Sequence, residues 1–96
     1  EVTFERFVAS LYMTALVQLG MMREPEVEPH VDLLGARQTI DTLGLIRQKT
    51  EGNLTDPEKN LLENCLYELR MAFVEVTNAL VRPPEGAAPD SVRGGK

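Results

Sequence analysis

Few side chains in this sequence have chemistry that could serve a site. The one cysteine, Cys65, cannot form a disulfide within the chain, and neither it nor the only histidine, His30, has ligand-like spacing around it. Leu62 and Leu66 accompany Cys65 at helical spacing, so its thiol is expected to fill apolar space, with no neighbouring cation to lower its pKa. His30 lies among acidic residues in a proline-rich stretch, and we interpret it as a solvent-facing side chain. A lone thiol without a partner favours a reducing, cytoplasmic setting.

An acidic stretch provides the one regular grouping of carboxylates. Glu24, Glu26 and Glu28 alternate around Pro25 and Pro29. Carboxylate oxygens bind divalent cations, but only a folded, concave loop gathers several of them on one ion. The prolines favour extended geometry instead, and connecting segments usually run over the surface. We therefore expect a solvated connector here, and we predict no metal and no cofactor.

The sequence carries no signature of catalysis. It has no glycine-rich phosphate loop after a strand, no HExxH or paired CxxC motif, and no serine on a nucleophile elbow. No set of residues supplies a nucleophile, a base and an electrophilic stabiliser together. We therefore predict that the protein is not an enzyme, and we nominate no catalytic residue.

Asp41 and Arg70 are the candidates for a structural polar contact. Arg37 and Asp41 have the i,i+4 spacing of a solvated ion pair on a helix surface, which contributes roughly 0.2–0.5 kcal/mol. The alternative is that Asp41 and Arg70 meet across helices, or across a dimer, and fix its register. Arg70 also lies beside a leucine stripe, on which its aliphatic stem can pack.

The first helix is expected over residues 4–20. Steps of four and three residues place five apolar side chains on one of its faces, and Gly20 supplies the left-handed residue that closes a helix. The five are Phe4, Val8, Leu11, Ala15 and Leu19. Other apolar residues cover much of the remaining circumference, so this helix must be covered on most sides.

The second helix is expected over residues 32–50, with Asp32 accepting its free amide hydrogens. Gly44 within it costs about 1 kcal/mol relative to alanine. Either the glycine is simply tolerated, or it forms a shallow strip with Ala36 and Ile40 where another helix comes close. We favour the close approach.

The third helix, over residues 56–81, has the strongest start signal. Thr55 is placed to cap it, with Pro57 in the first turn and Glu58 three residues after the threonine to cap reciprocally. A heptad stripe then follows. Its residues are Leu62, Leu66, Leu69, Phe73, Val76 and Leu80. Residues 1–82 thus form a single helical domain, whereas residues 83–96, rich in proline and glycine, are expected to be a flexible tail.

These elements predict an all-α fold, a three-helix antiparallel arrangement with a long C-terminal helix and a disordered tail. The third helix should span about 39 Å and overhang the first two, which span about 25–28 Å. A second copy is the simplest cover for the apolar stripe that continues along the overhang. We therefore hypothesise a homodimer built on the first and third helices. Its expected interface residues are Phe4, Val8, Leu11, Leu69, Phe73, Val76 and Leu80.

Charge and hydropathy argue against two kinds of partner. The net charge of −5 and the scattered basic residues argue against nucleic acid, which is bound through clustered lysine and arginine. The longest uncharged run, Phe7 to Met22, is shorter than the roughly 20 apolar residues that a membrane span needs. A membrane partner is therefore not expected.

Several blocks of residues resemble the bacterial domain of unknown function 1844 family. The most specific block runs from Lys49 to Thr55 as KTEGNLT. Further similar positions are Phe7-Val8, Ser10-Leu11, Ala15-Leu16, Leu19-Gly20, Asp32-Leu33, Ala36-Arg37, Thr39-Ile40-Asp41, Glu58, Leu61-Leu62, Leu69-Arg70 and Phe73-Val74. The resemblance covers about residues 4–76. It implies a small helical protein and brings no activity, cofactor or catalytic residue with it.

Two functions follow as hypotheses. The leading one is a non-catalytic interaction module that self-associates through its apolar stripes and presents the third helix to another protein. The alternative is a helical bundle that binds an apolar small molecule, or touches a membrane surface, through the uncharged first helix.

Overall fold

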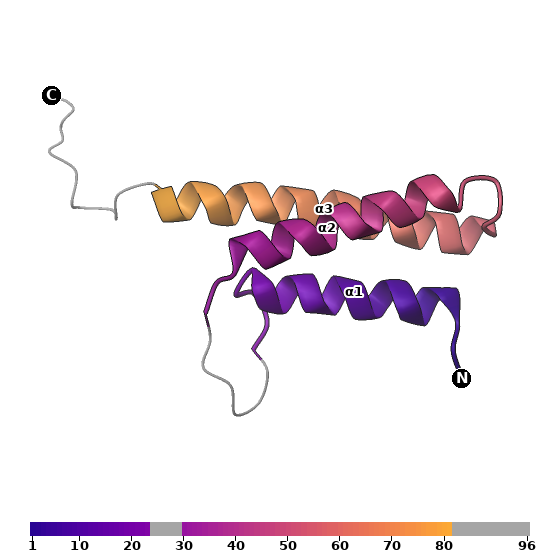
Figure 1. Cartoon of the computed structure of the whole chain (residues 1–96), viewed down its shortest axis with the longest axis horizontal. Helices are drawn as coiled ribbons and strands as arrows, with labels where there is room; N and C mark the ends of the chain where they lie inside the picture. Colours follow the sequence, from indigo (N-terminus) through magenta and orange to yellow (C-terminus); the bar gives the residue numbers. More distant parts are fainter. Residues whose placement is uncertain (24–29, 82–96) are drawn as a thin grey trace, which may run out of the picture.

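The computed structural model describes residues 1–23 and 30–81, which form three helices (Figure 1). They are α1 (Phe4–Gln18), α2 (Leu33–Lys49) and α3 (Asp56–Val81), and each helix packs against both of the others. Consecutive helices run in opposite directions, so the predicted all-α antiparallel arrangement is confirmed. The predicted connector at Glu24–Glu28 and the predicted tail at 83–96 lie outside the described residues.

Both ends of α1 are closed by local hydrogen bonds. The Thr3 hydroxyl accepts a bond from the amide of Arg6 at 3.0 Å. At the other end Gly20 has a φ of 78°, its amide donates to the Val17 carbonyl, and the Met21 amide donates to the Leu16 carbonyl. This bond pattern is a Schellman motif, and it uses carbonyls that the helix end leaves free. The helix therefore stops where Gly20 predicted, with Leu19 as its cap.

A polar junction joins the end of α1 to the start of α2. The Asp32 carboxylate accepts from the Gly35 amide at 2.9 Å, which confirms Asp32 as the N-cap. The Asp32 amide donates to the Gln18 carbonyl at 2.7 Å, and the Thr39 hydroxyl donates to the Gln18 side-chain oxygen at 2.8 Å. Gln18 thus bonds both to the cap and to the second turn of α2, which fixes how the two helices meet.

The start of α3 has the predicted capping box. The Thr55 amide donates to the Glu58 carboxylate at 2.9 Å, and the Glu58 amide donates to the Thr55 hydroxyl at 3.3 Å. Two groups that the helix start leaves unpaired are thereby satisfied reciprocally. The helix begins at Asp56 and runs to Val81, as the sequence predicts.

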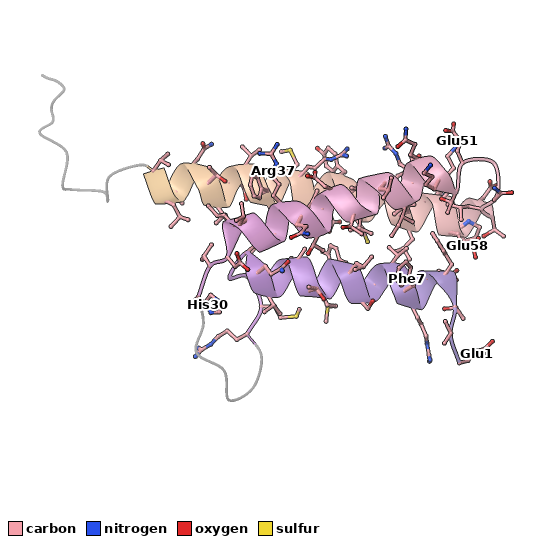
Figure 2. The ribbon with its side chains drawn as sticks, viewed as in Figure 1. Glu1, Phe7, His30, Arg37, Glu51 and Glu58 are labelled. Carbon is pink, nitrogen blue, oxygen red and sulfur yellow. The ribbon has the colours of Figure 1, made fainter. Side chains whose placement is uncertain are left out.

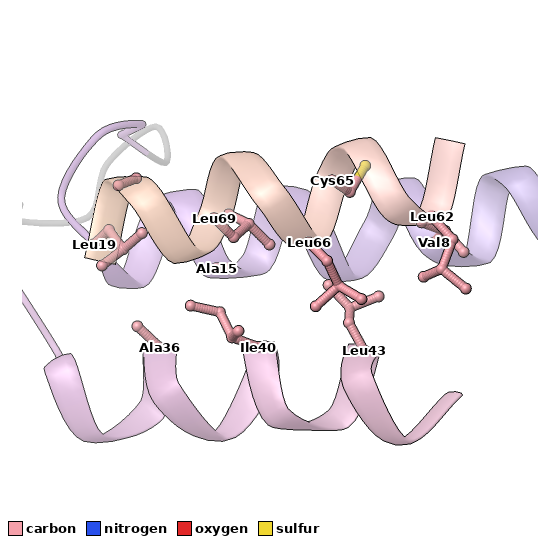
Figure 3. Packing of buried hydrophobic residues seen from close by; sticks show 11 residues of the cluster. Val8, Ala15, Leu19, Ala36, Ile40, Leu43, Leu62, Cys65, Leu66 and Leu69 are labelled. Atoms are coloured by element: carbon pink, nitrogen blue, oxygen red, sulfur yellow. The ribbon is translucent and has the colours of Figure 1, made fainter. Parts of the chain in front are cut away.

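The core lies where the three helices face one another (Figure 3). Each helix contributes the apolar face that its spacing predicts. The buried side chains are Val8, Ala15 and Leu19 from α1 and its cap, Ala36, Ile40 and Leu43 from α2, and Leu62, Cys65, Leu66, Leu69 and Ala72 from α3. Leu62, Leu66 and Leu69 are at most 1% exposed, so the N-terminal half of the α3 stripe is fully covered by α1 and α2.

The C-terminal part of α3 continues past the ends of α1 and α2 (Figure 1). Coverage of its inner stripe falls in the same direction, because Phe73 and Val76 are partly buried and Leu80 is 56% exposed. Among the described helices, none combines the length and the apolar character that crossing a membrane requires.

Candidate functional site

Six of the seven residues expected at a dimer interface pack within the core of their own chain or against it. Val8 and Leu69 are 0% exposed in the core. Phe4 and Leu11 pack against the edge of that core. The apolar spacing correctly predicted that these side chains are buried, but the helices that bury them belong to the same chain and not to a second copy. No surface of Val8 or Leu69 is left for a second copy to contact in this fold.

The other three residues, Phe73, Val76 and Leu80, lie in the C-terminal half of α3, where Phe73 and Val76 also pack against the core. Phe73 and Val76 each leave part of the side chain accessible, and Leu80 leaves more than half. The accessible portion of the expected interface is therefore the C-terminal end of the inner stripe. Its contact with a second chain stays a prediction.

Asp41 and Arg70 have different neighbours within the described chain. The Asp41 carboxylate lies 4.0 Å from the Nε atom of Arg37, and both side chains are more than 70% exposed. This is the solvated i,i+4 pair that the sequence offered as the simpler alternative. Arg70 lies over Gly44 of α2, with Nη2 3.3 Å from where a Cβ on that glycine would be. A contact between Asp41 and Arg70 of two copies stays a prediction.

Gly44 does not mark a close approach of helix backbones, so the interpretation favoured from the sequence is wrong. In the described part of the chain, the only atom of another element within 4 Å of a Cβ built there is the guanidinium nitrogen of Arg70. A flexible side chain, not the backbone of α3, fills the space beside the glycine. The reason is that Arg70 is long enough to reach across from α3 and cover this point.

A groove of about 750 Å³ lies between α2 and α3, towards the turn that joins them. Figure 2 labels Glu51 in this turn and Glu58 at the start of α3. The charged residues that line the groove are Arg47, Glu51, Asp56, Lys59, Glu63 and Arg70. Because the two signs are mixed, the lining concentrates no field of one sign on a ligand. The hydroxyl of Thr50 in the lining donates to the Ile46 carbonyl at 2.8 Å, so it is not free as a nucleophile.

No metal site is found among residues 1–23 and 30–81, where histidine, cysteine, aspartate and glutamate form no group of three. His30 is exposed, as expected, in the short described segment that leads into α2 (Figure 2).

Cys65 packs in the core, where it is 7% exposed, as the apolar-filler interpretation predicts. Burial raises the pKa of its thiol, and the negative charge of Glu68 raises it further. The thiol is therefore protonated at neutral pH, the form that is poor as a nucleophile.

Tyr12 and Glu68 form a hydrogen bond between α1 and α3. The Tyr12 hydroxyl donates to the Glu68 carboxylate at 2.7 Å. The pKa of Tyr12 is raised, first by this bond to Glu68, then by burial and by the charge of Glu68. The pair holds one side of α1 on α3, and no spacing in the sequence predicts it.

The sequence interpretation missed a set of exposed apolar residues on the outward side of α3. Tyr67, Met71 and Val74 are 67%, 50% and 54% exposed. They were detectable, because they also step by four and three residues, parallel to the inner stripe. The leucine pattern on the inner side is stronger and masks them.

Comparison with protein-family models identifies the family of this chain. Residues 1–75 match the family model described as Domain of unknown function (DUF1844). The chain belongs to this family. The DUF1844 match contains α1, α2 and α3 as far as Glu75, and so includes every buried core residue and ends before Val76 and Leu80. Comparisons with curated proteins and with solved structures give no match.

Proposed function

We propose that this protein is a non-catalytic interaction module that self-associates through apolar surface left uncovered on the C-terminal half of α3. The observation that carries this proposal is the exposure of large apolar side chains there. Met71, Val74, Leu80 and Val81 are each at least half exposed on eleven consecutive residues of one helix. Exposed apolar residues scattered singly need no explanation, but a concentration of them is typical of contact surfaces.

The energetic reason for self-association is the cost of leaving this surface in water. Covering apolar surface yields about 25 cal/mol for each Å² removed from water. A chain of this length hides only a little over about 60% of its unfolded surface, so its own margin of stability is small. A second copy that covers the end of α3 adds stability to the folded state through binding.

The chemistry of the described residues fits a module without catalysis. Cys65 is buried with a raised thiol pKa, and the groove between α2 and α3 mixes charges of both signs. We place the protein in the cytoplasm as part of the same proposal, since its single thiol suits a reducing compartment. Another protein that offers an apolar helix face is the second partner that α3 would accept.

Light scattering over a concentration series tests the proposal. The mass of the wild-type chain should rise from one chain to two as the concentration rises. A double variant, Val74→Glu with Leu80→Glu, places a charge on each side of α3 and should remain a monomer throughout. Gln38→Glu adds the same charge to an exposed position on α2 and should behave as wild type. A wild-type chain that stays monomeric at every concentration would contradict self-association.

A second candidate function rests on the outward face of α1. Phe7 and Met13 are each 46% exposed, and the helix carries no charge from Phe7 to its end at Gln18. The Ser10 hydroxyl donates to the Phe7 carbonyl at 2.7 Å and the Thr14 hydroxyl to the Ser10 carbonyl at 2.9 Å, so both donors are used by the helix itself. Such a face suits an apolar ligand or a membrane surface. The net charge of −5 disfavours anionic lipid.

Zwitterionic vesicles test this second candidate. If α1 contacts lipid, the wild-type chain should sediment with the vesicles and Phe7→Ser should not. Failure of the wild-type chain to sediment with them would remove the membrane version of this function.

A further inference from the structure

The outward side of α3 carries a complete heptad stripe without a single charge. Its positions step by four and three residues over three heptads. They are Asn60, Asn64, Tyr67, Met71, Val74, Asn78 and Val81. All seven side chains are exposed, and the four that are not asparagine are between 50% and 76% exposed. Within the described chain no helix covers this side, because α1 and α2 pack on the opposite one.

We propose that two copies of the chain pair in parallel and in register along this outward stripe of α3. The inference rests on the self-association proposed above, and it names the face and the orientation. A sustained stripe at four- and three-residue spacing is what allows two helices to interlock along their length. From Asn60 to Val81 the stripe would extend over roughly 32 Å of helix.

The asparagines argue for the parallel, in-register arrangement. Asn64 and Asn78 occupy equivalent heptad positions, with Met71 between them, and the other position of the repeat holds Asn60, Tyr67, Val74 and Val81. In a parallel pair each residue faces its own counterpart, so amide faces amide and apolar side chain faces apolar side chain. In an antiparallel pair the two kinds of position face each other, and any register that pairs most of the stripe would set Asn64 against an apolar side chain, Val74 or Val81. A buried asparagine at this position is known to fix register and the two-stranded state, at some cost in affinity.

The amides are free to take up that role. In the part of the chain that the structure describes, the side-chain amide of neither Asn64 nor Asn78 makes a hydrogen bond. Each has two donors and an acceptor to offer its counterpart.

The charges beside the stripe support the same orientation. In a parallel pair, Arg70 of one copy lies beside Glu75 of the other, and symmetry forms this contact twice. Arg70 makes no ion pair with the described residues of its own chain, and its long, exposed side chain would turn from its place over Gly44 to reach the partner's Glu75. The parallel arrangement also brings together two like charges, Glu63 of one copy and Glu68 of the other. The Glu68 carboxylate, however, already accepts a hydrogen bond from Tyr12 on the α1 side of its own chain. An antiparallel pair would instead bring Glu68 and Glu75 of the two copies together.

Analytical ultracentrifugation of single variants tests the face. Val74→Glu buries a charge in the stripe and should raise the dimer dissociation constant about tenfold or more. Leu80→Glu, on the inner side of the same helix, and Gln38→Glu, on α2, should leave it within about threefold. Circular dichroism should show all three folded, since each replaced side chain is exposed. A dimer lost in Leu80→Glu but kept in Val74→Glu would overturn this inference while leaving self-association in place. A monomeric wild type would overturn both.

Charge reversal tests the orientation. Arg70→Glu should weaken the dimer, and adding Glu75→Arg should restore it, because the pair forms between copies. Residues five apart on one helix do not face each other, so restoration cannot arise within a chain. Failure of the second change to restore the dimer would contradict the parallel orientation.

Cross-linking gives an independent measure of register. Asn78→Cys in a Cys65→Ala background should form a disulfide between copies under mild oxidation, and Gln38→Cys in the same background should not. Efficient cross-linking of Asn78→Cys only when it is mixed with Asn60→Cys, which occupies the other heptad position, would indicate antiparallel pairing and overturn the proposal.

Discussion

Replacing two glycines of α2 by alanine, one at a time, should change the stability of this protein in opposite directions. Gly44→Ala should raise the free energy of unfolding by about 0.5–1 kcal/mol. The gain is the helix propensity of alanine over glycine, which is about 1 kcal/mol in a helix interior. One tight contact offsets part of this gain, because the new Cβ would lie 3.3 Å from Nη2 of Arg70. That nitrogen ends a long, exposed side chain, which can shift by a few tenths of an ångström at little cost.

Gly35→Ala meets a different environment at the start of the same helix. Its Cβ would overlap the Asp32 carboxylate and lie 2.7 Å from the Gln18 side-chain nitrogen. To relieve this overlap, the Asp32 carboxylate would have to move and weaken its hydrogen bond with the Gly35 amide, at a cost of about 1 kcal/mol. The Gln18 side chain would also have to move, which would weaken its hydrogen bond with Thr39 at a similar cost. Together these losses exceed the gain in propensity, so we expect a net loss of about 1 kcal/mol.

Urea unfolding followed by circular dichroism measures both changes. All variants should be compared at one protein concentration, because self-association makes apparent stability depend on it. In a thermal scan, 1 kcal/mol corresponds to a shift in Tm of roughly 4–8 °C for a chain of this size. If Gly44→Ala destabilised the protein as much as Gly35→Ala, α3 would have to lie against the backbone of α2 at Gly44, and the assignment of that space to the Arg70 side chain would be refuted.

Three further changes test the core, a cap and an interhelical bond. Leu66→Ala, at a position 1% exposed, should lower the free energy of unfolding by about 2–5 kcal/mol. Its control, Leu34→Ala, at a position 85% exposed, should change that free energy by no more than about 0.5 kcal/mol. Similar losses for the two variants in urea unfolding would contradict the assigned core. Thr55→Ala should cost about 1 kcal/mol and increase amide exchange in the first turn of α3, and unchanged exchange would show that the capping box contributes nothing. The raised pKa of Tyr12 means that its hydrogen bond to Glu68 stabilises the fold below the usual tyrosine pKa and is lost as pH rises through the folded value. Tyr12→Phe should therefore lose less stability than wild type as pH rises above about 10 in urea titrations, and equal losses would assign the alkaline decline to other groups.

The helix ends were predictable from sequence because their chemistry is local. The capping box of Thr55 and Glu58 involves residues three apart, and Gly20 and Asp32 act within one turn of the helices that they end. Such signals depend only on neighbouring residues, so the three helices were placed within two residues at each end.

What covers each apolar face was not predictable in the same way. The spacing around Val8 and Leu69 showed correctly that both must be buried, but it cannot distinguish cover by the same chain from cover by another. Both prove to be 0% exposed within one chain. The bond between Tyr12 and Glu68 joins residues 56 positions apart, and only the packing of α1 on α3 brings them together. The position of Arg70 over Gly44 depends likewise on how α2 crosses α3.

The burial of Cys65 gives this molecule an internal reporter of its own opening. The thiol is 7% exposed and lies near enough to Tyr12 of α1 to affect the pKa of that tyrosine. A thiol reagent therefore reaches the sulfur when α1 leaves α3, or when the whole chain unfolds. The labelling rate, divided by the rate for the unfolded chain, gives the fraction of molecules that are open at any moment. Because the sequence has one cysteine, that signal reports a single point on the surface between α1 and α3.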